Sequence, residues 1–194
     1  MTLLLLARHA AHATVNRVLC GRSPGVHLGD AGRHQAARLA GRLRRDAPAA
    51  LYASPQPRAR ETAEALGLPV RVEPALDEID FGAWAGRPFA ELEADPAWRR
   101  WNEQRATARP PGGEAMHEAQ SRVLRWTATL PALHPGETVV AVSHADVIKA
   151  AVMAHLGLPL DAHWRLDIAP ASLSGIELWE GGGRVRFVNE MLEG

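Results

Sequence analysis

The run Leu3–Ala7, followed at once by Arg8 and His9, constrains the fold of this chain more than any other stretch. Four consecutive leucines are typical of a strand buried on both faces, as strands are inside a parallel sheet. Ligands of open α/β sheets bind at the carboxyl ends of the strands. Arg8 and His9 therefore stand where we expect a substrate to arrive, although an exposed loop pair is the plainer alternative.

The rest of the chain alternates between strand and helix patterns. Expected strands lie at 3–7, 49–53, 70–72, 138–143, 172–179 and 184–188, and expected helices at 30–45, 57–66, 89–94, 96–105, 114–130 and 145–156. This alternation predicts an α/β fold, a three-layer α/β/α sandwich with a mostly parallel central sheet. The last two strands should form an antiparallel hairpin around Gly181–Gly183. No repeat or long linker divides the chain, so we expect a single domain over 1–194.

Composition narrows the classes of partner. Lys+Arg and Asp+Glu balance at 22 each in 194 residues, which argues against nucleic acid or an anionic membrane as the main partner. All the basic residues but Lys149 are arginine, which suits bidentate binding of phosphate or carboxylate. The lone Cys20 excludes an intrachain disulfide. The apolar run Leu3–Ala7 is too short for a membrane span and lacks the basic start and cleavage site of a signal peptide. We therefore expect a cytoplasmic protein.

Three of the expected strands end in residues suited to phosphate chemistry. Arg8 and His9 follow the first strand, Arg58 comes shortly after the second, and His144 follows the strand at 138–143. If these strands are parallel neighbours, the histidines and arginines meet at one end of the sheet. Arginines neutralise a phosphoryl group, and a histidine can attack it or hydrogen-bond to it.

Five motifs follow one another along the chain: Arg8–Ala10, Ser54–Ala63, Leu76–Glu78 with Phe81–Gly86, Pro111–Glu114, and Val142–Ala145. In this order they resemble the motifs of the histidine phosphatase superfamily, which includes cofactor-dependent phosphoglycerate mutases and many small phosphatases. One such motif alone would be a weak signal, but five in order are specific and cover most of the chain. The resemblance implies a phosphoglycerate mutase-like fold.

The resemblance also implies catalytic roles. His9 would be the nucleophile and form a phosphohistidine, which splits hydrolysis into two easier transfers. Arg8, Arg58 and His144 would hold the phosphoryl oxygens. Glu78 would protonate the leaving oxygen and then help to activate water, for which its pKa must be raised. From the residues alone, the neighbouring carboxylates at positions 77 and 80 remain alternatives for this acid.

Five further residues would bind the substrate according to the same resemblance. They are Asn16, Gly21, Arg22, Ser23 and Ala145, and neither a metal nor another cofactor is implied. Ala145, like the alanine after His9, replaces a glycine of the motif. A positive φ at either position would strain the alanine. Position 12, often Thr or Ser in the family, is a histidine here, so substrate selectivity is open.

Other nucleophile motifs fit less well. Gly21–Gly25 matches the Gly-x-Ser-x-Gly of serine hydrolases, but Pro24 follows the serine, where a backbone N–H is required. Cys20 does not fit a cysteine phosphatase, because Val26 occupies the position where that loop requires arginine. A metal site formed by His9, His12, His144 and Asp146 remains an alternative.

The chain is compact between Phe81 and Pro110, where mutases of the family usually carry longer insertions. We therefore favour a metal-independent phosphomonoesterase that acts on a small-molecule phosphate monoester. A phosphoglycerate mutase-type phosphotransferase and a non-enzymatic phospho-ligand-binding module are the alternatives, and a homodimer is left open. Arg22 and Arg109 would favour a second anionic group on the substrate if they point inward.

Overall fold

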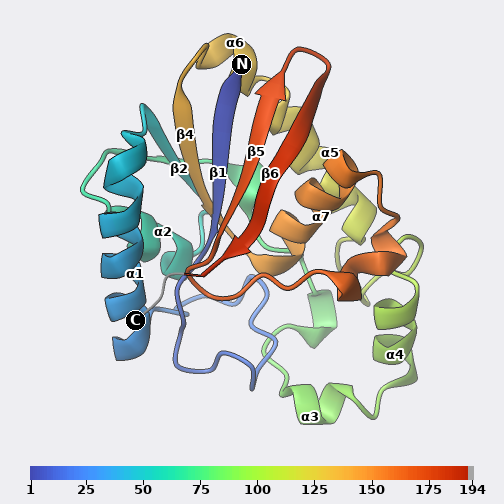
Figure 1. Ribbon diagram of the computed structural model, residues 1–194. Coiled ribbons are helices and arrows are strands. Elements are labelled where there is room, and N and C mark those ends of the chain that lie inside the picture. The colour runs from blue at the N-terminus through green and yellow to red at the C-terminus, as the bar shows by residue number, and fades with distance from the viewer. Residues whose placement is uncertain (192–194) are drawn as a thin grey trace.

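A six-stranded sheet forms the middle layer of the protein in the computed structural model, which describes residues 1–191 (Figure 1). Its strands are β1 (Thr2–Arg8), β2 (Ala50–Ala53), β3 (Val70–Val72), β4 (Thr138–Ser143), β5 (Leu173–Trp179) and β6 (Gly182–Glu190). The strand order is β3-β2-β4-β1-β5-β6. The first four are parallel, whereas β5 runs antiparallel to β1 and β6 antiparallel to β5. The predicted fold class is confirmed.

Helices cover both faces of this sheet (Figure 1). On one face lie α1 (Asp30–Leu43) and α2 (Pro57–Glu64), and on the other α5 (Met116–Thr127) and α7 (Ala145–Leu156). Three short helices complete the set: α3 (Phe89–Leu92), α4 (Pro96–Glu103) and α6 (Leu130–Leu133). Single 3₁₀ turns lie at Arg44–Asp46, Pro74–Leu76 and Gly82–Trp84, and a longer one at Leu160–Arg165.

The leucines of β1 alternate between two hydrophobic cores. Leu4 and Leu6 belong to the core under α5 and α7, and Leu5 and Ala7 to the core under α1 and α2. All four are at most 1% exposed. Burial of a leucine side chain contributes about 1.5–3 kcal/mol, so both cores fix the position of β1. Arg8, its last residue, is thereby held at the carboxyl end of the sheet.

The structure corrects two expected boundaries. The helix expected at 114–130 spans only Met116–Thr127, and a separate α6 starts at Leu130 because Pro131 in its first turn cannot continue the preceding helix. The final turn is tighter than expected: Trp179 pairs with Gly182, so β6 starts at Gly182. Gly181 has φ 78°, a left-handed conformation that suits glycine in a two-residue hairpin turn.

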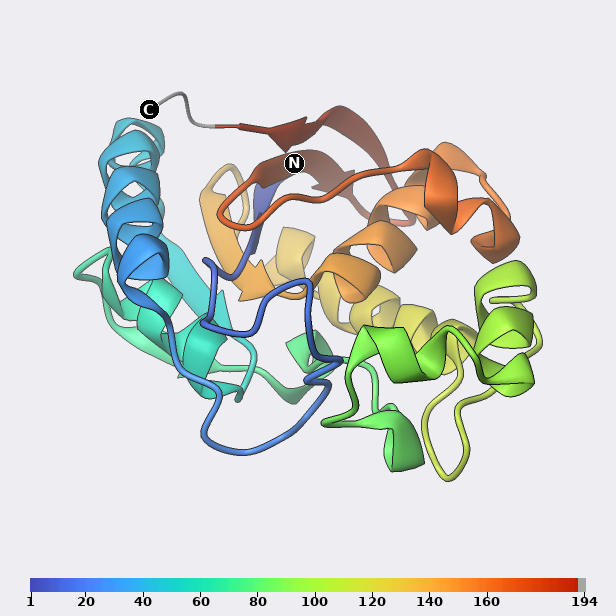
Figure 2. The same ribbon diagram turned by 90° about the horizontal axis from the view of Figure 1, so that it is seen from below.

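The loop after β1 packs along the segment that precedes α3, as Figure 2 shows from below. The backbone N–H of Leu19 donates to the carbonyl of Arg87 (2.9 Å), and that of Phe89 donates to the carbonyl of Arg17 (3.0 Å). Val18 and Pro88 also form a backbone bridge. These contacts place the loop beneath the carboxyl ends of β1 and β4. Among residues 1–191, no helix has both the length and the apolar character needed to cross a bilayer.

Candidate active site

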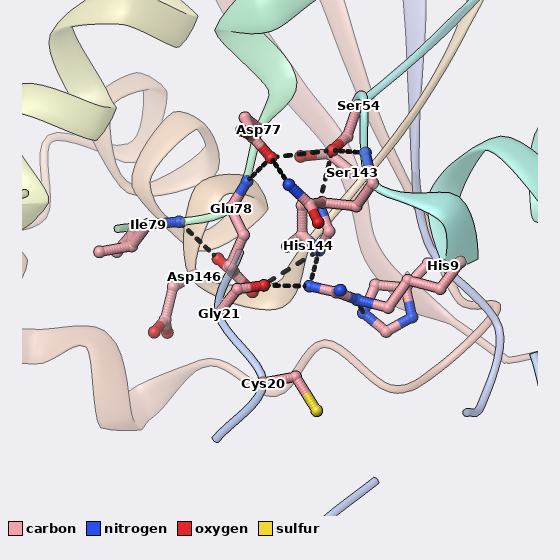
Figure 3. Close-up of polar contacts among 12 residues, drawn as sticks. His9, Cys20, Gly21, Ser54, Asp77, Glu78, Ile79, Ser143, His144 and Asp146 are labelled. Carbon is pink, nitrogen blue, oxygen red and sulfur yellow. Dashed lines mark hydrogen bonds and ion pairs between the residues drawn. The ribbon is translucent and has the colours of Figure 1, made fainter. Parts of the chain in front are cut away.

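The ends of β1, β2 and β4 bring the predicted polar residues together. The N–H of His9 donates to the carbonyl of Ser143, and the N–H of Ser54 to that of Val142, both at 2.9 Å. These bonds extend the sheet one residue beyond the strands. They align His9, Ser54 and His144, which Figure 3 shows in one cluster with Glu78. We call Arg8, His9, Arg58, Glu78 and His144 the strand-end cluster.

The imidazole ring of His9 is held in one orientation and is uncharged. Its Nδ1 lies 2.8 Å from the carbonyl oxygen of Ala10, and because a carbonyl only accepts, Nδ1 carries the proton. The lone pair is therefore on Nε2, which receives a hydrogen bond from Nε of Arg58 at 3.3 Å. Burial, followed by the charges of Arg58 and Arg8, lowers the pKa of His9 well below its usual value. An unprotonated Nε2 is the form that can attack phosphorus.

Arg58 and Arg8 each have a buried guanidinium nitrogen without an acceptor among residues 1–191. Arg58 donates from Nη2 to the carbonyl of Gly21 (2.7 Å), and the same Nη2 lies 3.2 Å from Nδ1 of His144. Arg8 donates from Nη1 to the carbonyl of Ile168 (2.7 Å). Nη1 of Arg58 and Nε of Arg8 are buried without a partner in the part of the chain that the structure describes. Leaving a buried donor unpaired costs about 1–3 kcal/mol, more for a charged group, and a bound anion would remove that cost.

Glu78 has the properties of a general acid. Its Oε1 accepts a hydrogen bond from the N–H of Ile79 (2.9 Å), and its Oε2 lies 3.6 Å from Nδ1 of His144. Burial and then the negative charge of Asp146 raise the pKa of Glu78 to about 7, against the opposing charges of Arg58 and Arg8. A carboxyl group with that pKa holds a proton for much of the time at neutral pH.

The two neighbouring carboxylates have other partners. Oδ1 of Asp77 accepts from the amide of Gln56 (2.8 Å) and from the backbone N–H of Glu78 (2.9 Å). Oδ1 of Asp80 accepts from the N–H of Gly82 (2.9 Å). Asp77 therefore holds the backbone of Glu78 in place, and Asp80 stabilises its own turn. Of the three carboxylates, only Glu78 lines the pocket.

His144 is fully buried and lies in a chain of polar contacts. Its Nε2 is 2.8 Å from Oγ of Ser54, whose hydroxyl donates to Oδ1 of Asp77 at 3.3 Å. Figure 3 shows this connection from His144 through Ser54 to Asp77. Burial and then the charge of Arg58 lower the pKa of His144 well below its usual value. The contacts fix the plane of the His144 ring against Arg58.

Two glycines let the loops behind Glu78 approach each other closely. A Cβ on Gly82 would lie 2.1 Å from the carbonyl oxygen of Pro111, and one on Gly113 would lie 2.2 Å from that of Asp80. The N–H of Glu114 donates to the same Asp80 carbonyl at 2.7 Å. The third and fourth sequence motifs therefore dock on each other and support the loop that carries Glu78.

A pocket of about 100 Å³ opens beside the cluster. It is lined by Arg8, His9, His12, Val15, Asn16, Val18, Leu19, Cys20, Gly21, Arg58, Glu78 and Phe89. Two of the residues predicted to bind substrate, Asn16 and Gly21, therefore line this pocket, and Asn16 has a left-handed φ of 62°. His144 lies behind the lining residues: it contacts Arg58, and its ring centroid is 5.1 Å from that of His9.

Three of the residues predicted to bind substrate do not line the pocket. Arg22 donates to the backbone carbonyl of Glu78 (2.7 Å) and to Oε2 of Glu114 (2.9 Å), so it acts as a brace between loops. The N–H of Ser23 donates to the carbonyl of Cys20 in a turn (2.8 Å). Ala145 is the first residue of α7 and is absent from the lining.

The alanines that replace motif glycines are not strained. Neither Ala10 nor Ala145 has a positive φ. Ala10 is fully buried in the core under α1 and α2, and its N–H donates to Oγ1 of Thr62 at 3.0 Å. Both alanines thus adopt backbone conformations that suit any L residue.

Sequence reasoning missed the apolar part of the pocket wall. Val15, Val18 and Leu19 lie in a loop, which no periodic pattern marks, and Phe89 was expected only as the start of a helix. His12 was named as a possible metal ligand and as a departure from the family pattern, but not as part of the pocket wall. The described residues contain no group of three or more His, Cys, Asp or Glu side chains placed to hold a metal ion. The metal-site alternative therefore lacks a ligand set within residues 1–191.

Comparison with known proteins gives a consistent picture. The family model described as "Histidine phosphatase superfamily (branch 1)" matches residues 4–191. The chain is 40% identical over 199 residues to the bifunctional protein Rv2228c of Mycobacterium tuberculosis, covering 97% of this chain but 54% of that relative, so it spans about half the relative's length. It is 35% identical over 189 residues to phosphoserine phosphatase 1 of Hydrogenobacter thermophilus, covering 93% of this chain and 88% of the relative.

A solved structure shows the same fold. The mycobacterial glucosyl-3-phosphoglycerate phosphatase Rv2419c, in complex with VO3, superposes with a TM-score of 0.88 at 30% identity. The match covers 97% of this chain and 99% of that one. The Hydrogenobacter relative is named a phosphoserine phosphatase and the superposed mycobacterial protein a glucosyl-3-phosphoglycerate phosphatase.

Proposed function

Because this chain belongs to the histidine phosphatase superfamily, we propose that it is a metal-independent phosphomonoesterase acting on a small phosphorylated metabolite through a phosphohistidine intermediate. One observation carries the proposal: the unprotonated Nε2 of His9 contacts Arg58, and His9 shares the pocket with two guanidinium groups that each have a buried nitrogen without a partner among residues 1–191. A phosphoryl group placed there gives each donor an oxygen and gives Nε2 a phosphorus atom to attack.

In the first step, the Nε2–P bond forms while the bond from phosphorus to the ester oxygen breaks. The ester oxygen takes the proton of Glu78 and leaves as an alcohol. In the second step, water attacks phosphorus and Glu78, now a carboxylate, accepts its proton. The N–P bond breaks, and inorganic phosphate leaves with His9 neutral again. Arg8 and Arg58 stabilise the charge on the equatorial oxygens in both steps.

The test is hydrolysis of p-nitrophenyl phosphate in excess EDTA by the native chain, by His9→Ala and by His117→Ala. His117 is an exposed histidine outside the pocket and serves as the matched control. We expect EDTA-resistant turnover that His9→Ala abolishes and His117→Ala leaves unchanged. Substantial turnover by folded His9→Ala would contradict the phosphohistidine mechanism, and loss of activity in EDTA with recovery on metal addition would contradict metal independence.

A phosphotransferase and a binding module would give different results in this assay and in two further ones. A phosphotransferase would be inactive with water as acceptor but would exchange labelled phosphate between phosphoglycerates. A binding module would bind phosphate esters without turning over any of them. The complete strand-end cluster, with a neutral His9 and a protonatable Glu78, supports catalysis over binding alone.

A further inference from the structure

The part of the pocket wall that comes from the loop after β1 carries no charged residue. This loop wall consists of His12, Val15, Asn16, Val18, Leu19, Cys20 and Gly21, together with Phe89. The charged residues of the lining are Arg8, Arg58 and Glu78, and the phosphoryl transfer proposed above uses all three. Whatever the phosphoryl group is attached to must therefore contact neutral side chains, four of them aliphatic or aromatic.

The arginines that could receive a second anion are paired with carboxylates. Arg22 lies 3.2 Å from Oδ2 of Asp77 and 2.9 Å from Oε2 of Glu114. Arg109 donates from both terminal nitrogens to the two carboxylate oxygens of Glu118, each at 2.7 Å. Neither arginine lines the pocket, and the charge of each is already paired with a carboxylate of the protein.

His12 does not replace the missing cation. Burial, then the charges of Arg58 and Arg8, lowers the pKa of His12 to about 4, so its imidazole is neutral at physiological pH. Its Nδ1 lies 3.1 Å from Oγ1 of Thr14, a contact that orients the ring. A neutral imidazole can hydrogen-bond to a hydroxyl group, but it does not compensate a carboxylate.

Arg17 is the remaining cation on this loop, and it is exposed. Its Nη2 donates to the carbonyl of Ala13, and the residue is absent from the pocket lining. Its charge is therefore screened by solvent.

We propose that the natural substrate is a monoester whose leaving group is an uncharged alcohol with an apolar face, so that the phosphoryl group is its only anion. The proposal rests on the phosphatase function proposed above. A carboxylate on the leaving group would lose its hydration in this pocket, find no unpaired cation on the loop wall and share the pocket with Glu78. An apolar group would instead pack against Val15, Val18 and Phe89.

The experiment compares esters that differ mainly in this feature. Glycerol 3-phosphate and 3-phosphoglycerate have the same three-carbon frame, with a hydroxymethyl group in one where the other has a carboxylate, and benzyl phosphate adds an apolar face. We expect kcat/KM for glycerol 3-phosphate to exceed that for 3-phosphoglycerate by roughly 10- to 200-fold, the range of a pocket that discriminates one group. Benzyl phosphate should be better still. Equal or better turnover of 3-phosphoglycerate would overturn the proposal.

Equilibrium binding of the three esters to folded His9→Ala, measured by calorimetry, separates this proposal from the proposed function. If the native chain turns over no ester, the phosphatase function fails, yet the order of the dissociation constants still tests the leaving group. Tighter binding of 3-phosphoglycerate than of glycerol 3-phosphate would overturn the inference even if the chain is an active phosphatase.

A gain-of-charge variant tests the loop wall directly. Val15→Arg should raise kcat/KM for 3-phosphoglycerate by about tenfold or more relative to glycerol 3-phosphate, because it supplies the absent cation. Arg17→Ala is the control and should leave the ratio of the two substrates unchanged. If Arg17→Ala selectively reduces the turnover of 3-phosphoglycerate, the exposed arginine serves as the anion site and the proposal is wrong.

Discussion

The strand-end cluster and the loop wall face the same pocket but are held in place in different ways. His9 and His144 follow strands buried in two cores, and hydrogen bonds that extend the sheet fix their backbone. Most of the loop wall lies on the loop after β1. Isolated backbone bridges between Val18 and Pro88 and between His12 and Leu28 help to hold this loop in place. His9, Arg58 and His144 thus stand on the sheet ends and α2, and Glu78 stands on a loop that other motifs support. Most of the residues proposed for selectivity stand on the loop after β1.

This difference predicts that substitutions in the strand-end cluster reduce turnover of every ester, whereas those in the loop wall change the ranking of esters. Removal of His9 and addition of a cation at Val15, both described above, are the extreme cases. Three further variants probe the strand-end cluster, each with a smaller expected effect than the one before.

Arg58→Ala should give the largest loss among them. Arg58 is 1% exposed and contacts His9, His144 and Gly21, so its removal deletes both a charge and the donor that faces the phosphoryl group. We expect kcat to fall by roughly 10³–10⁵-fold, the range for an arginine that stabilises phosphoryl transfer. Steady-state kinetics on p-nitrophenyl phosphate and on glycerol 3-phosphate would measure it.

Arg60→Ala is the matched control, two residues along the same helix. Arg60 is exposed and makes only a long ion pair with Glu64, 3.5 Å. Its removal should leave kcat unchanged. A loss of less than tenfold in folded Arg58→Ala, or one confined to a single ester, would show that the strand-end cluster does not act on the phosphoryl group common to all substrates.

Glu78→Gln should affect esters according to their leaving group. Glutamine keeps the size of the side chain but cannot give a proton to the leaving alkoxide. We expect a loss of about 10²–10⁴-fold on alkyl esters, the usual contribution of a general acid, and a much smaller one on p-nitrophenyl phosphate, whose leaving group needs no proton. Glu93→Gln, an exposed glutamate, is the control. Equal losses on both classes of ester would indicate a different acid.

The sequence was sufficient to predict what depends on strands and on short motifs. The leucines of β1 specify a strand buried on both faces, and the motifs place His9 and His144 at neighbouring strand ends and Arg58 shortly after a third. A further motif singles out Glu78, although its raised pKa depends on burial and on Asp146, which only the folded chain shows.

The prediction of pocket residues failed where a side chain binds a partner that is distant in the sequence. Arg22 was assigned to the phosphate pocket, yet its guanidinium binds Glu114, 92 residues away, and the carbonyl of Glu78. Nothing local in the sequence distinguishes an arginine that faces a ligand from one that braces two loops. The apolar part of the loop wall was missed for a related reason, because Val15, Val18 and Leu19 follow no helical or strand period.

Asp146→Asn should change kcat least of the three variants, and its specific effect should be on the pH dependence of kcat. Asp146 lies beside Glu78 in Figure 3 and pairs with Nη1 of Arg105 at 3.0 Å, an interaction that helps to keep its pKa below the usual value. Its negative charge opposes ionisation of Glu78. Since the acid must be protonated to act, turnover of alkyl esters should decline as pH rises through the pKa of Glu78, about 7.

Neutralising Asp146 lowers the pKa of Glu78, so in Asp146→Asn this decline should begin at a lower pH. The readout is the pH dependence of kcat on glycerol 3-phosphate, with p-nitrophenyl phosphate as the internal reference that does not need the acid. The change also leaves the buried Arg105 without its ionic partner, so the melting temperature must be measured beside the kinetics. An unchanged profile in a folded variant, or equal losses on both esters, would show that Asp146 supports the fold without tuning Glu78.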